Sequence, residues 1–335
     1  MSIIIIGAGN WGTVLANIFA ETQKVFLWTL TQNEAEDINN SRENKQFLPG
    51  IKLSNNIHAE QKYTRPIEPN DIVIVVVPSR KIPELAMEIK DKGYDRFILL
   101  NASKGVRHDN LQTIGEIVHN TLPNVRFANL TGPTIARELA QGLPAKAVLA
   151  SKDIDLLFSL QSSLKNSLLF FEFSTDVKGV ELASSLKGLI AIATGMVDGL
   201  GYETNVYGLI MTYGLAEFAN LMDFLCVDSK TVYSIAGMGD LITTCMSENS
   251  RNRQFGKLLA EGYTTDEALK KVGMEVEGVS MAKTVRKFTT LQLQLPLISL
   301  VSEVIFNDDL LKSKEERINK LKQALTEVLF EKVRN

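Results

Sequence analysis

The chain has 335 residues, of which 45% are hydrophobic and 22% charged, a composition typical of a folded globular protein. This length exceeds what one hydrophobic core usually organises, so we expect two domains. A formal net charge of −3 gives no basis for nucleic acid or an anionic membrane as a partner. Only Cys226 and Cys245 are present, which excludes a disulfide framework and favours a cytoplasmic location. The N-terminal apolar run is four isoleucines, too short for a secretory signal.

A glycine-rich motif lies at residues 7–12. Four isoleucines from Ile3 precede Gly7-Ala8-Gly9-Asn10-Trp11-Gly12, and a helical pattern follows from Thr13 to Ala20. A buried strand, a G-x-G-x-x-G turn and a helix together are typical of dinucleotide binding. Gly7 allows the tight turn, Gly9 lets the backbone approach a diphosphate, and Gly12 lets the helix pack on the strand. The alternative is a glycine-rich turn that has no ligand.

Further apolar runs alternate with segments of helical length. We expect strands at residues 25–28, 71–77, 97–100, 127–130, 147–150 and 168–173. This alternation predicts βαβ units and a doubly wound, mostly parallel sheet of the Rossmann type. Ligands of such sheets bind at the carboxyl ends of the strands.

Strand patterns stop near Val177, so we predict an α/β Rossmann-type domain over residues 1–176 and an all-α domain over residues 177–335. The expected helices are residues 180–200, 209–224 and 229–236, one opened by a capping box at residues 264–267, and an amphipathic helix carrying Ile318, Leu321, Leu325 and Val328. The segment 180–200 is apolar enough to suggest a membrane span. Charges at Glu181, Lys187 and Asp198 instead favour a buried helix.

Two loops after predicted strands carry polar groups. Lys104 and Gly105 follow the strand that ends at Leu100, so Lys104 is expected in the ligand cleft, the alternative being a solvated loop lysine. Gly132 follows the strand that ends at Leu130, and a helix is expected to open at Thr134. Backbone N–H groups beside a hydroxyl suit an anion or a substrate hydroxyl, although plain helix capping is the alternative.

Lys187 lies among leucines and isoleucines on the expected buried helix. Lysines are rarely buried unless they are paired or functional. Burial with a cationic neighbour would lower the lysine pKa toward the range of a catalytic base. The alternative is a structural ion pair with Glu181 or Asp198.

The last polar segments lie in the second half. Two glycines precede Asp240, which suggests a carboxylate held close to a site. Ser250, Arg251 and Asn252 offer a hydroxyl, a guanidinium and an amide, groups that suit a phosphate monoester, with a capped helix start as the alternative. The histidines and cysteines follow no metal-binding spacing, so no metal site is predicted.

These segments, in this order, resemble one family, the NAD(P)-dependent glycerol-3-phosphate dehydrogenases. The matching stretches are GAGNWGT at 7–13, LPGIKL at 48–53, VVVPS at 75–79, SKG at 103–105, GPTIARELAQGLP at 132–144, SLKGLIAIATGMVDGLG at 185–201, GMGDLITTC at 237–245, SRNRQFG at 250–256 and VEG at 276–278. The resemblance implies reversible conversion of dihydroxyacetone phosphate to sn-glycerol 3-phosphate for phospholipid synthesis, with NAD or NADP. It also implies a homodimer, as is common among bacterial members.

The resemblance also implies roles for individual residues. Lys187 matches the proton donor and acceptor. The substrate-binding positions are Lys104, Gly132, Thr134, Asp240, Ser250, Arg251 and Asn252. The cofactor-binding positions are Gly7, Gly9, Asn10, Trp11, Gly12, Lys104, Ala136, Arg251, Glu275 and Glu277.

Several positions depart from the family pattern. Gly188 stands where the family has asparagine, Tyr207 and Tyr213 replace basic residues, and Glu275 is usually apolar. The run from Thr29 to Gln32 has neither the acid expected for NAD nor an arginine for NADP, so it predicts no preference. Two alternatives stay open: a related hydroxyacid or 6-phosphogluconate-type dehydrogenase, and a dinucleotide sensor that has lost turnover.

Overall fold

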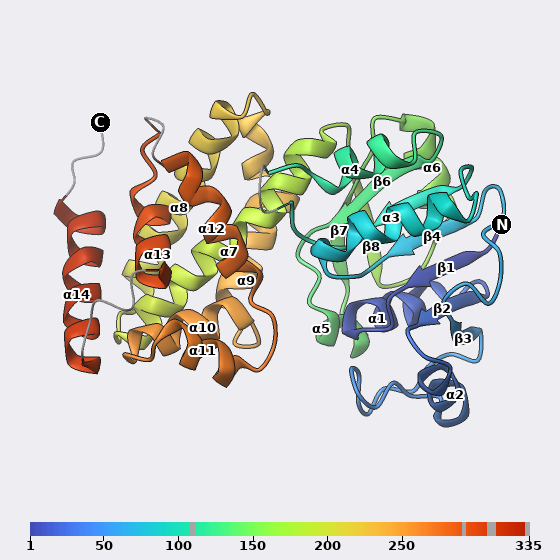
Figure 1. The fold of residues 1–335 in the computed structure, drawn as a ribbon, viewed down its shortest axis with the longest axis horizontal. Coiled ribbons are helices and arrows are strands. Elements are labelled where there is room, and N and C mark those ends of the chain that lie inside the picture. Colours follow the sequence, from blue (N-terminus) through green and yellow to red (C-terminus); the bar gives the residue numbers. More distant parts are fainter. Residues whose placement is uncertain (108–110, 290–292, 307–312, 332–335) are drawn as a thin grey trace. The chain divides into compact units, whose positions relative to one another are not determined.

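The computed structural model describes residues 1–107, 111–289, 293–306 and 313–331 (Figure 1). The chain divides into two compact units. Unit 1 comprises residues 1–107 and 112–181, and unit 2 comprises residues 108–111 and 182–335. The division falls within one helix, α7 (Val177–Gly199).

Unit 1 is built on an eight-stranded sheet. Its strands are β1 (Ile3–Ile6), β2 (Val25–Thr29), β3 (Ile57–Gln61), β4 (Ile72–Val75), β5 (Ile98–Asn101), β6 (Arg126–Thr131), β7 (Ala145–Ala150) and β8 (Leu169–Ser174). The order β3-β2-β1-β4-β5-β6-β7-β8 changes direction between β1 and β4, which confirms the doubly wound topology. Only the pairing of β6 with β7 is antiparallel among the described strands. Strand β3 was not anticipated, because its IHAEQ sequence alternates polar with apolar residues at a sheet edge.

Helices connect these strands. They are α1 (Asn10–Phe19), α2 (Gln32–Ser41), the short helix η1 (Ser79–Lys81), α3 (Ile82–Asp91), α4 (Ile114–Thr121), α5 (Ala136–Ala140) and α6 (Ile154–Ser163). Helix α5 begins two residues later than the sequence predicted. Because Pro133 and the extended backbone of Ile135 precede it, Thr134 lies outside the helix.

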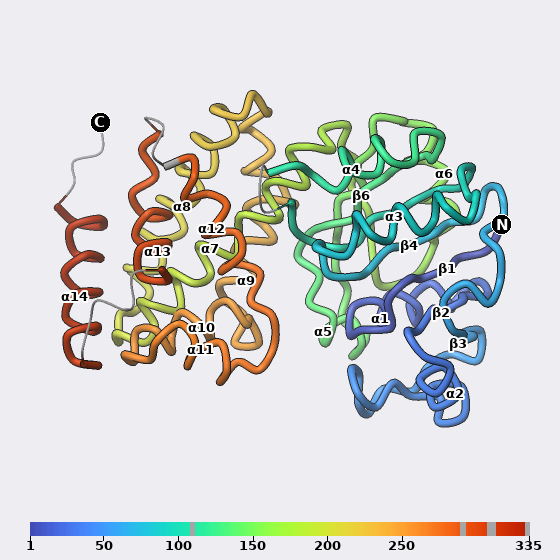
Figure 2. Tube along the Cα trace, viewed as in Figure 1, coloured from blue at the N-terminus to red at the C-terminus, as the bar shows by residue number. Residues whose placement is uncertain are grey.

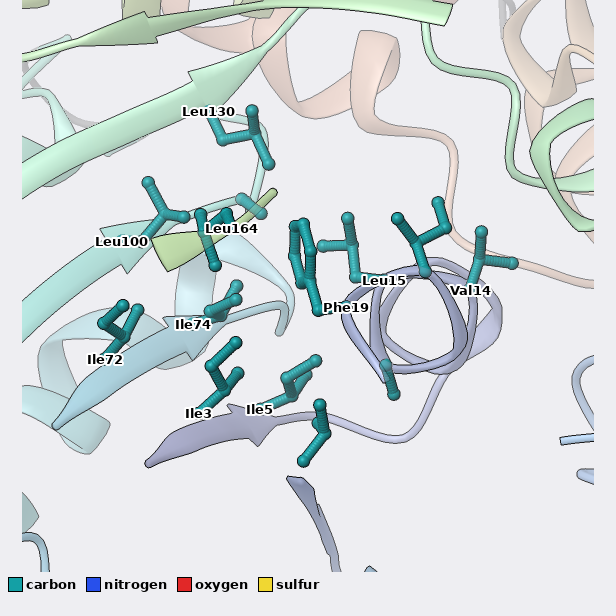
Figure 3. Packing of buried hydrophobic residues seen from close by; sticks show 14 of the residues in the cluster. Ile3, Ile5, Val14, Leu15, Phe19, Ile72, Ile74, Leu100, Leu130 and Leu164 are labelled. Carbon is teal, nitrogen blue, oxygen red and sulfur yellow. The ribbon is translucent and has the colours of Figure 1, made fainter. Parts of the chain in front are cut away.

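Strand β1 shows why a run of isoleucines forms a central strand. Alternate side chains point to opposite faces of a sheet. Ile3 and Ile5 pack with Phe19 and Leu15 of α1 on one face (Figure 3), whereas Ile4 and Ile6 join the cluster that includes residues of α3 and α4 on the other. Both faces are therefore buried, and β1 places the glycine turn at the carboxyl edge of the sheet.

Unit 2 is helical in its described residues, as the tube in Figure 2 shows. After α7 come α8 (Thr204–Phe224), η2 (Ser229–Tyr233), η3 (Ile235–Gly239), α9 (Asp240–Met246), α10 (Arg251–Ala260), α11 (Thr265–Val272), α12 (Glu277–Thr289), α13 (Pro296–Phe306), α14 (Lys314–Thr326) and η5 (Glu327–Glu331). The single helix expected over residues 229–236 is wrong. Ser234 has an extended backbone that separates a 3₁₀ turn from a π turn.

Helix α7 is long and apolar enough to cross a membrane, but 94% of its most apolar window is buried in the folded chain. It packs against α10 with almost no space between the backbones. A Cβ atom on Gly256 would overlap the carbonyl oxygen of Ile192, and one on Gly195 would overlap the carbonyl oxygen of Arg253. Glycine at these positions therefore sets how closely the two helices approach.

Two buried carboxyl groups support the first turns of neighbouring helices. Glu217 of α8 accepts hydrogen bonds from the backbone N–H groups of Leu297 and Ile298 at 2.8 and 2.9 Å. Glu181 of α7 accepts from the N–H of Gly115 at 3.0 Å. Burial raises the pKa of Glu181 to about 8, against hydrogen bonds from Thr113 and Gly115 that lower it.

We expect Gly256→Ala to lower the free energy of unfolding by about 1–3 kcal/mol, because the added methyl group meets backbone that cannot rotate away. Gly208 of α8 is the matched control, since it is helical and exposed and its Cβ position is open. Gly208→Ala should raise the free energy of unfolding by up to about 1 kcal/mol. Denaturant unfolding of both variants tests this. Equal effects at the two positions would contradict the close packing of α7 on α10.

The pKa of Glu181 predicts a dependence of stability on pH. Between its ordinary value of 4.5 and about 8, the native protein holds a proton that the unfolded chain releases. Raising the pH through this window therefore lowers the free energy of unfolding. Glu181→Gln removes this contribution, so the stability of the variant relative to the parent should increase from about pH 5 to about pH 8. Denaturant unfolding across that range measures the difference, and a difference independent of pH would count against a proton on Glu181.

Candidate active site

The glycine turn after β1 fits a bound dinucleotide. Gly7 has φ +116°, and a Cβ atom there would overlap the carbonyl oxygen of Val76, so only glycine is compatible with this turn. A Cβ on Gly12 would overlap the carbonyl oxygen of Gly7. Gly9, by contrast, faces open space with no heavy atom within 4 Å of its Cβ position. It is the N-cap of α1 and makes no side-chain capping bond, so the first N–H groups of the helix are available for a diphosphate.

The loop after β5 is held against the neighbouring strands. The buried amide of Asn101 donates to the side-chain oxygen of Asn129 at 2.6 Å and to the carbonyl of Ser103 at 3.0 Å. The hydroxyl of Ser103 accepts from the N–H of Val77 at 2.9 Å. These bonds fix the backbone that presents Lys104, which is half-buried. Gly105 has φ +116° and lies against Ser79, so the loop makes a turn that favours glycine.

The end of β6 and the loop that follows it have a tight backbone and a buried hydroxyl without a partner among the described residues. Gly132 has φ +151°, and its Cβ position is 3.0 Å from Cα of Ala147, so this position requires glycine. The Thr134 hydroxyl donates to the carbonyl of Gly132 at 3.2 Å. Because α5 has only five residues and starts at Ala136, the expected helix N-terminus beside Thr134 is wrong. The hydroxyl of Thr131 is buried and has no hydrogen-bond partner among the described residues.

The centre of unit 2 holds a buried ion pair. Lys187, on α7, pairs with Asp240, the first residue of α9, and their side chains are 10% and 3% exposed. The described partner of the ammonium is thus a carboxylate, and an opposite charge favours the charged form of a lysine, whereas the cationic neighbour stays a prediction. Gly237, in the turn before Asp240, must be glycine, since a Cβ there would overlap the carbonyl oxygen of Val232.

The partners suggested for a structural Lys187 have contacts of their own. Glu181 binds the N–H of Gly115. Asp198 accepts from the hydroxyl of Tyr207 at 2.9 Å and from the guanidinium of Arg253 at 3.1 Å. Tyr207 thus contacts the acid that also binds Arg253. Burial, followed by the bond to Asp198, raises the pKa of Tyr207.

The start of α10 carries the predicted phosphate-binding residues. The Ser250 hydroxyl accepts from the N–H of Arg253 at 3.3 Å. Ser250 therefore caps the helix, which was the alternative to phosphate binding in the sequence analysis. Arg251 is exposed and donates from Nη1 to the carbonyl of Glu275 at 2.9 Å. The side-chain oxygen of Asn252 accepts from the N–H of Gly278 at 3.0 Å. A guanidinium has five N–H donors and an amide two, so these bonds leave donors for an anion.

Gly188 belongs to this cluster. A Cβ atom at this position would lie 3.1 Å from Cα of Gly278 and 3.2 Å from the amide nitrogen of Asn252. A side chain at position 188 would therefore require the amide of Asn252 or the backbone of Gly278 to shift slightly. Nothing in the described contacts explains the tyrosine at position 213.

Cys245 lies on α9, near the ion pair. It is buried, and burial raises the pKa of its thiol to about 11, against a hydrogen bond from Thr194 and the charge of Lys187, which lower it. A thiol in this state is a poor nucleophile at neutral pH. We therefore assign Cys245 a packing role.

The predicted residues fall into two sets. In unit 1, the glycine turn and the loops after β5 and β6 follow the carboxyl ends of their strands, and they carry Gly7, Gly9, Asn10, Trp11, Gly12, Lys104, Gly132, Thr134 and Ala136. In unit 2, Lys187 pairs with Asp240. The start of α10 contacts Glu275 and also the first turn of α12, which contains Glu277. Sequence reasoning missed Gly278, whose closeness to Gly188 shows only in the fold.

Comparisons with known proteins agree with this arrangement. Residues 2–157 match the family described as NAD-dependent glycerol-3-phosphate dehydrogenase N-terminus, and residues 176–314 match its C-terminus. A glycerol-3-phosphate dehydrogenase [NAD(P)+] of Fusobacterium nucleatum is 34% identical over 328 residues, which is 96% of each chain. One from Chlorobium phaeobacteroides is 34% identical over 313 residues, covering 92% of this chain and 94% of the relative.

Solved structures agree as well. The crystal structure of glycerol-3-phosphate dehydrogenase from Coxiella burnetii superposes with a TM-score of 0.86 at 29% identity, covering 96% of this chain and 98% of the other. The Plasmodium falciparum glycerol-3-phosphate dehydrogenase shares the fold, with a TM-score of 0.87 at 21% identity over 100% of this chain and 97% of that one.

The ion pair can be tested through stability. Asp240→Asn leaves the Lys187 ammonium without its buried carboxylate, which should lower the free energy of unfolding by about 3–5 kcal/mol. The double variant Lys187→Met with Asp240→Leu removes both charges and should be more stable than Asp240→Asn alone. Denaturant unfolding compares the three proteins. A double variant no more stable than the single one would show that the cost comes from packing and not from charge.

Proposed function

Because the chain belongs to the NAD-dependent glycerol-3-phosphate dehydrogenase family, we propose that it reversibly reduces dihydroxyacetone phosphate to sn-glycerol 3-phosphate with a nicotinamide dinucleotide. The product would serve glycerophospholipid synthesis. The observation that carries the mechanism is the buried pair of Lys187 and Asp240, because it supplies a positioned proton donor in an apolar helix bundle. The cytoplasmic location and the homodimer stay predictions from the sequence.

Lys187 is the proton donor in this proposal. During reduction, its ammonium donates a proton to the C2 oxygen of dihydroxyacetone phosphate as that carbon accepts hydride. In the reverse direction, the neutral amine takes the proton from the C2 hydroxyl. Asp240 holds the ammonium at one position, and its own place is fixed at the start of α9 by the glycine-containing turn before it. General acid–base catalysis by a positioned side chain typically contributes about 10²–10⁴-fold to the rate.

The start of α10 would bind the phosphate group of the substrate. Arg251 is exposed, and its planar fork of donors suits two phosphate oxygens. The amide nitrogen of Asn252 and the backbone N–H groups of Arg251 and Asn252 would add donors, and the positive end of the helix dipole lies at the same place. A site of this kind can bind a dianion in a chain whose net charge is −3.

The residues around the glycine turn fit the coenzyme. Gly9 leaves room for the diphosphate, and the uncapped start of α1 supplies N–H donors to it. When bound, the nicotinamide supplies or accepts the hydride. Lys104 lies on the loop after β5, whose backbone is fixed by Asn101 and Ser103, and we assign it contacts with both coenzyme and substrate.

We expect the purified protein to oxidise NADH or NADPH when dihydroxyacetone phosphate is added, as measured by the loss of the reduced-nicotinamide absorbance. Lys187→Ala should lower kcat at least about 100-fold, because the variant lacks the ammonium that we propose protonates the C2 oxygen.

Lys178→Ala is the control on the same helix. Lys178 forms an exposed ion pair with Glu116 at 3.0 Å, and we give it no part in the reaction, so this variant should keep the parental kcat. Parental turnover in Lys187→Ala would disprove the assignment of the proton donor. A parent that binds dinucleotide but does not oxidise it with this substrate would disprove the proposed reaction and favour the sensor.

A further inference from the structure

The end of β2 lies beside the glycine turn. The N–H of Gly7 donates to the carbonyl of Trp28 at 3.3 Å, so the backbone after Trp28 continues from the same carboxyl edge of the sheet (Figure 1). Thr29 ends β2, Leu30 follows with 79% of its surface exposed, and Thr31 is the N-cap of α2. In a Rossmann-type sheet this turn faces the adenosine ribose of the dinucleotide.

A carboxylate folds back over this turn. Glu34, in the first turn of α2, accepts hydrogen bonds from the N–H of Leu30 at 3.0 Å and from the N–H of Thr31 at 3.2 Å. The N–H of Glu34 in turn donates to the Thr31 hydroxyl at 3.2 Å, which completes a capping box. The acid that the sequence lacked directly after β2 is therefore supplied by the helix that follows.

We propose that Glu34 makes the chain selective for NAD over NADP, an inference that rests on the proposed dehydrogenase function. An acid at this turn accepts a hydrogen bond from the ribose 2′-hydroxyl of NAD. The additional phosphate of NADP needs the same turn, where the backbone N–H groups that would bind it already donate to Glu34. The phosphate would also face a negative charge at short range.

The other charged residues around the turn also favour NAD over NADP. The charged residues of α2 itself are Glu34, Glu36 and Asp37, all acidic. The backbone N–H of Lys62 donates to the carbonyl of Thr29 at 3.1 Å, but its ammonium pairs with Glu88 at 2.5 Å. Arg42, beyond the end of α2, donates from its guanidinium to the carbonyls of Ser54 and Ile57.

Glu34→Gln tests the proposal with little change to the fold, because glutamine at this position also completes a capping box. Glu267→Gln is the matched control, since Glu267 has the same place in the capping box of α11 and accepts from the N–H of Thr264 at 2.9 Å. Isothermal titration calorimetry with NADH and with NADPH gives the dissociation constants of the parent and both variants without any turnover.

We expect the parent to bind NADH at least about tenfold more tightly than NADPH, because the Glu34 carboxylate would repel the additional phosphate of NADPH. Glu34→Gln should lower that ratio about tenfold or more, chiefly through tighter NADPH binding, whereas Glu267→Gln should leave it unchanged. Equal binding of both coenzymes by the parent, or an unchanged ratio in Glu34→Gln, would overturn the role of Glu34. Binding of neither coenzyme by the parent would overturn the dinucleotide site itself, a result distinct from a changed ratio.

Discussion

The candidate site depends on how closely three helix backbones approach one another. Helix α7 meets α10 where Gly195 and Gly256 leave no room for a methyl group, and it meets the start of α12 where Gly188 and Gly278 are in contact. A residue on α7 is therefore fixed in position by two neighbours along its length. Lys187 precedes Gly188, which contacts Gly278, by one residue. Glycines that take no part in the reaction therefore fix the position of the proposed proton donor.

Charge placement follows from this packing. An apolar bundle tolerates an ionised group only when another group compensates it. Lys187 has Asp240, and Glu217 has the two N–H groups at the start of α13. Glu181 accepts a backbone hydrogen bond, yet burial still raises its pKa to about 8, so this group balances its burial by holding a proton.

Local signals in the sequence predicted much of the fold, and contacts between distant segments account for what they missed. Short stretches of sequence predict the glycine turn, the doubly wound sheet and the buried helix that carries Lys187, and the structure confirms all three. The partner of Lys187 could not be predicted, since pairing with Asp240 depends on how α9 packs on α7. Strand β3 was missed because an edge strand needs little apolar sequence. Glu34 was missed because its carboxylate reaches back across a turn of the helix.

The departures from the family pattern bear on whether the site has decayed. Two of these substitutions make definite contacts in the structure. Tyr207 donates to Asp198, which keeps its ion pair with Arg253, so the loss of a basic residue leaves that acid bonded. A Cβ atom at Gly188 would lie 3.2 Å from the amide nitrogen of Asn252, so a larger residue at this position would require that amide to shift. These contacts are compatible with an active enzyme, and they give no support to a dinucleotide sensor that has lost turnover.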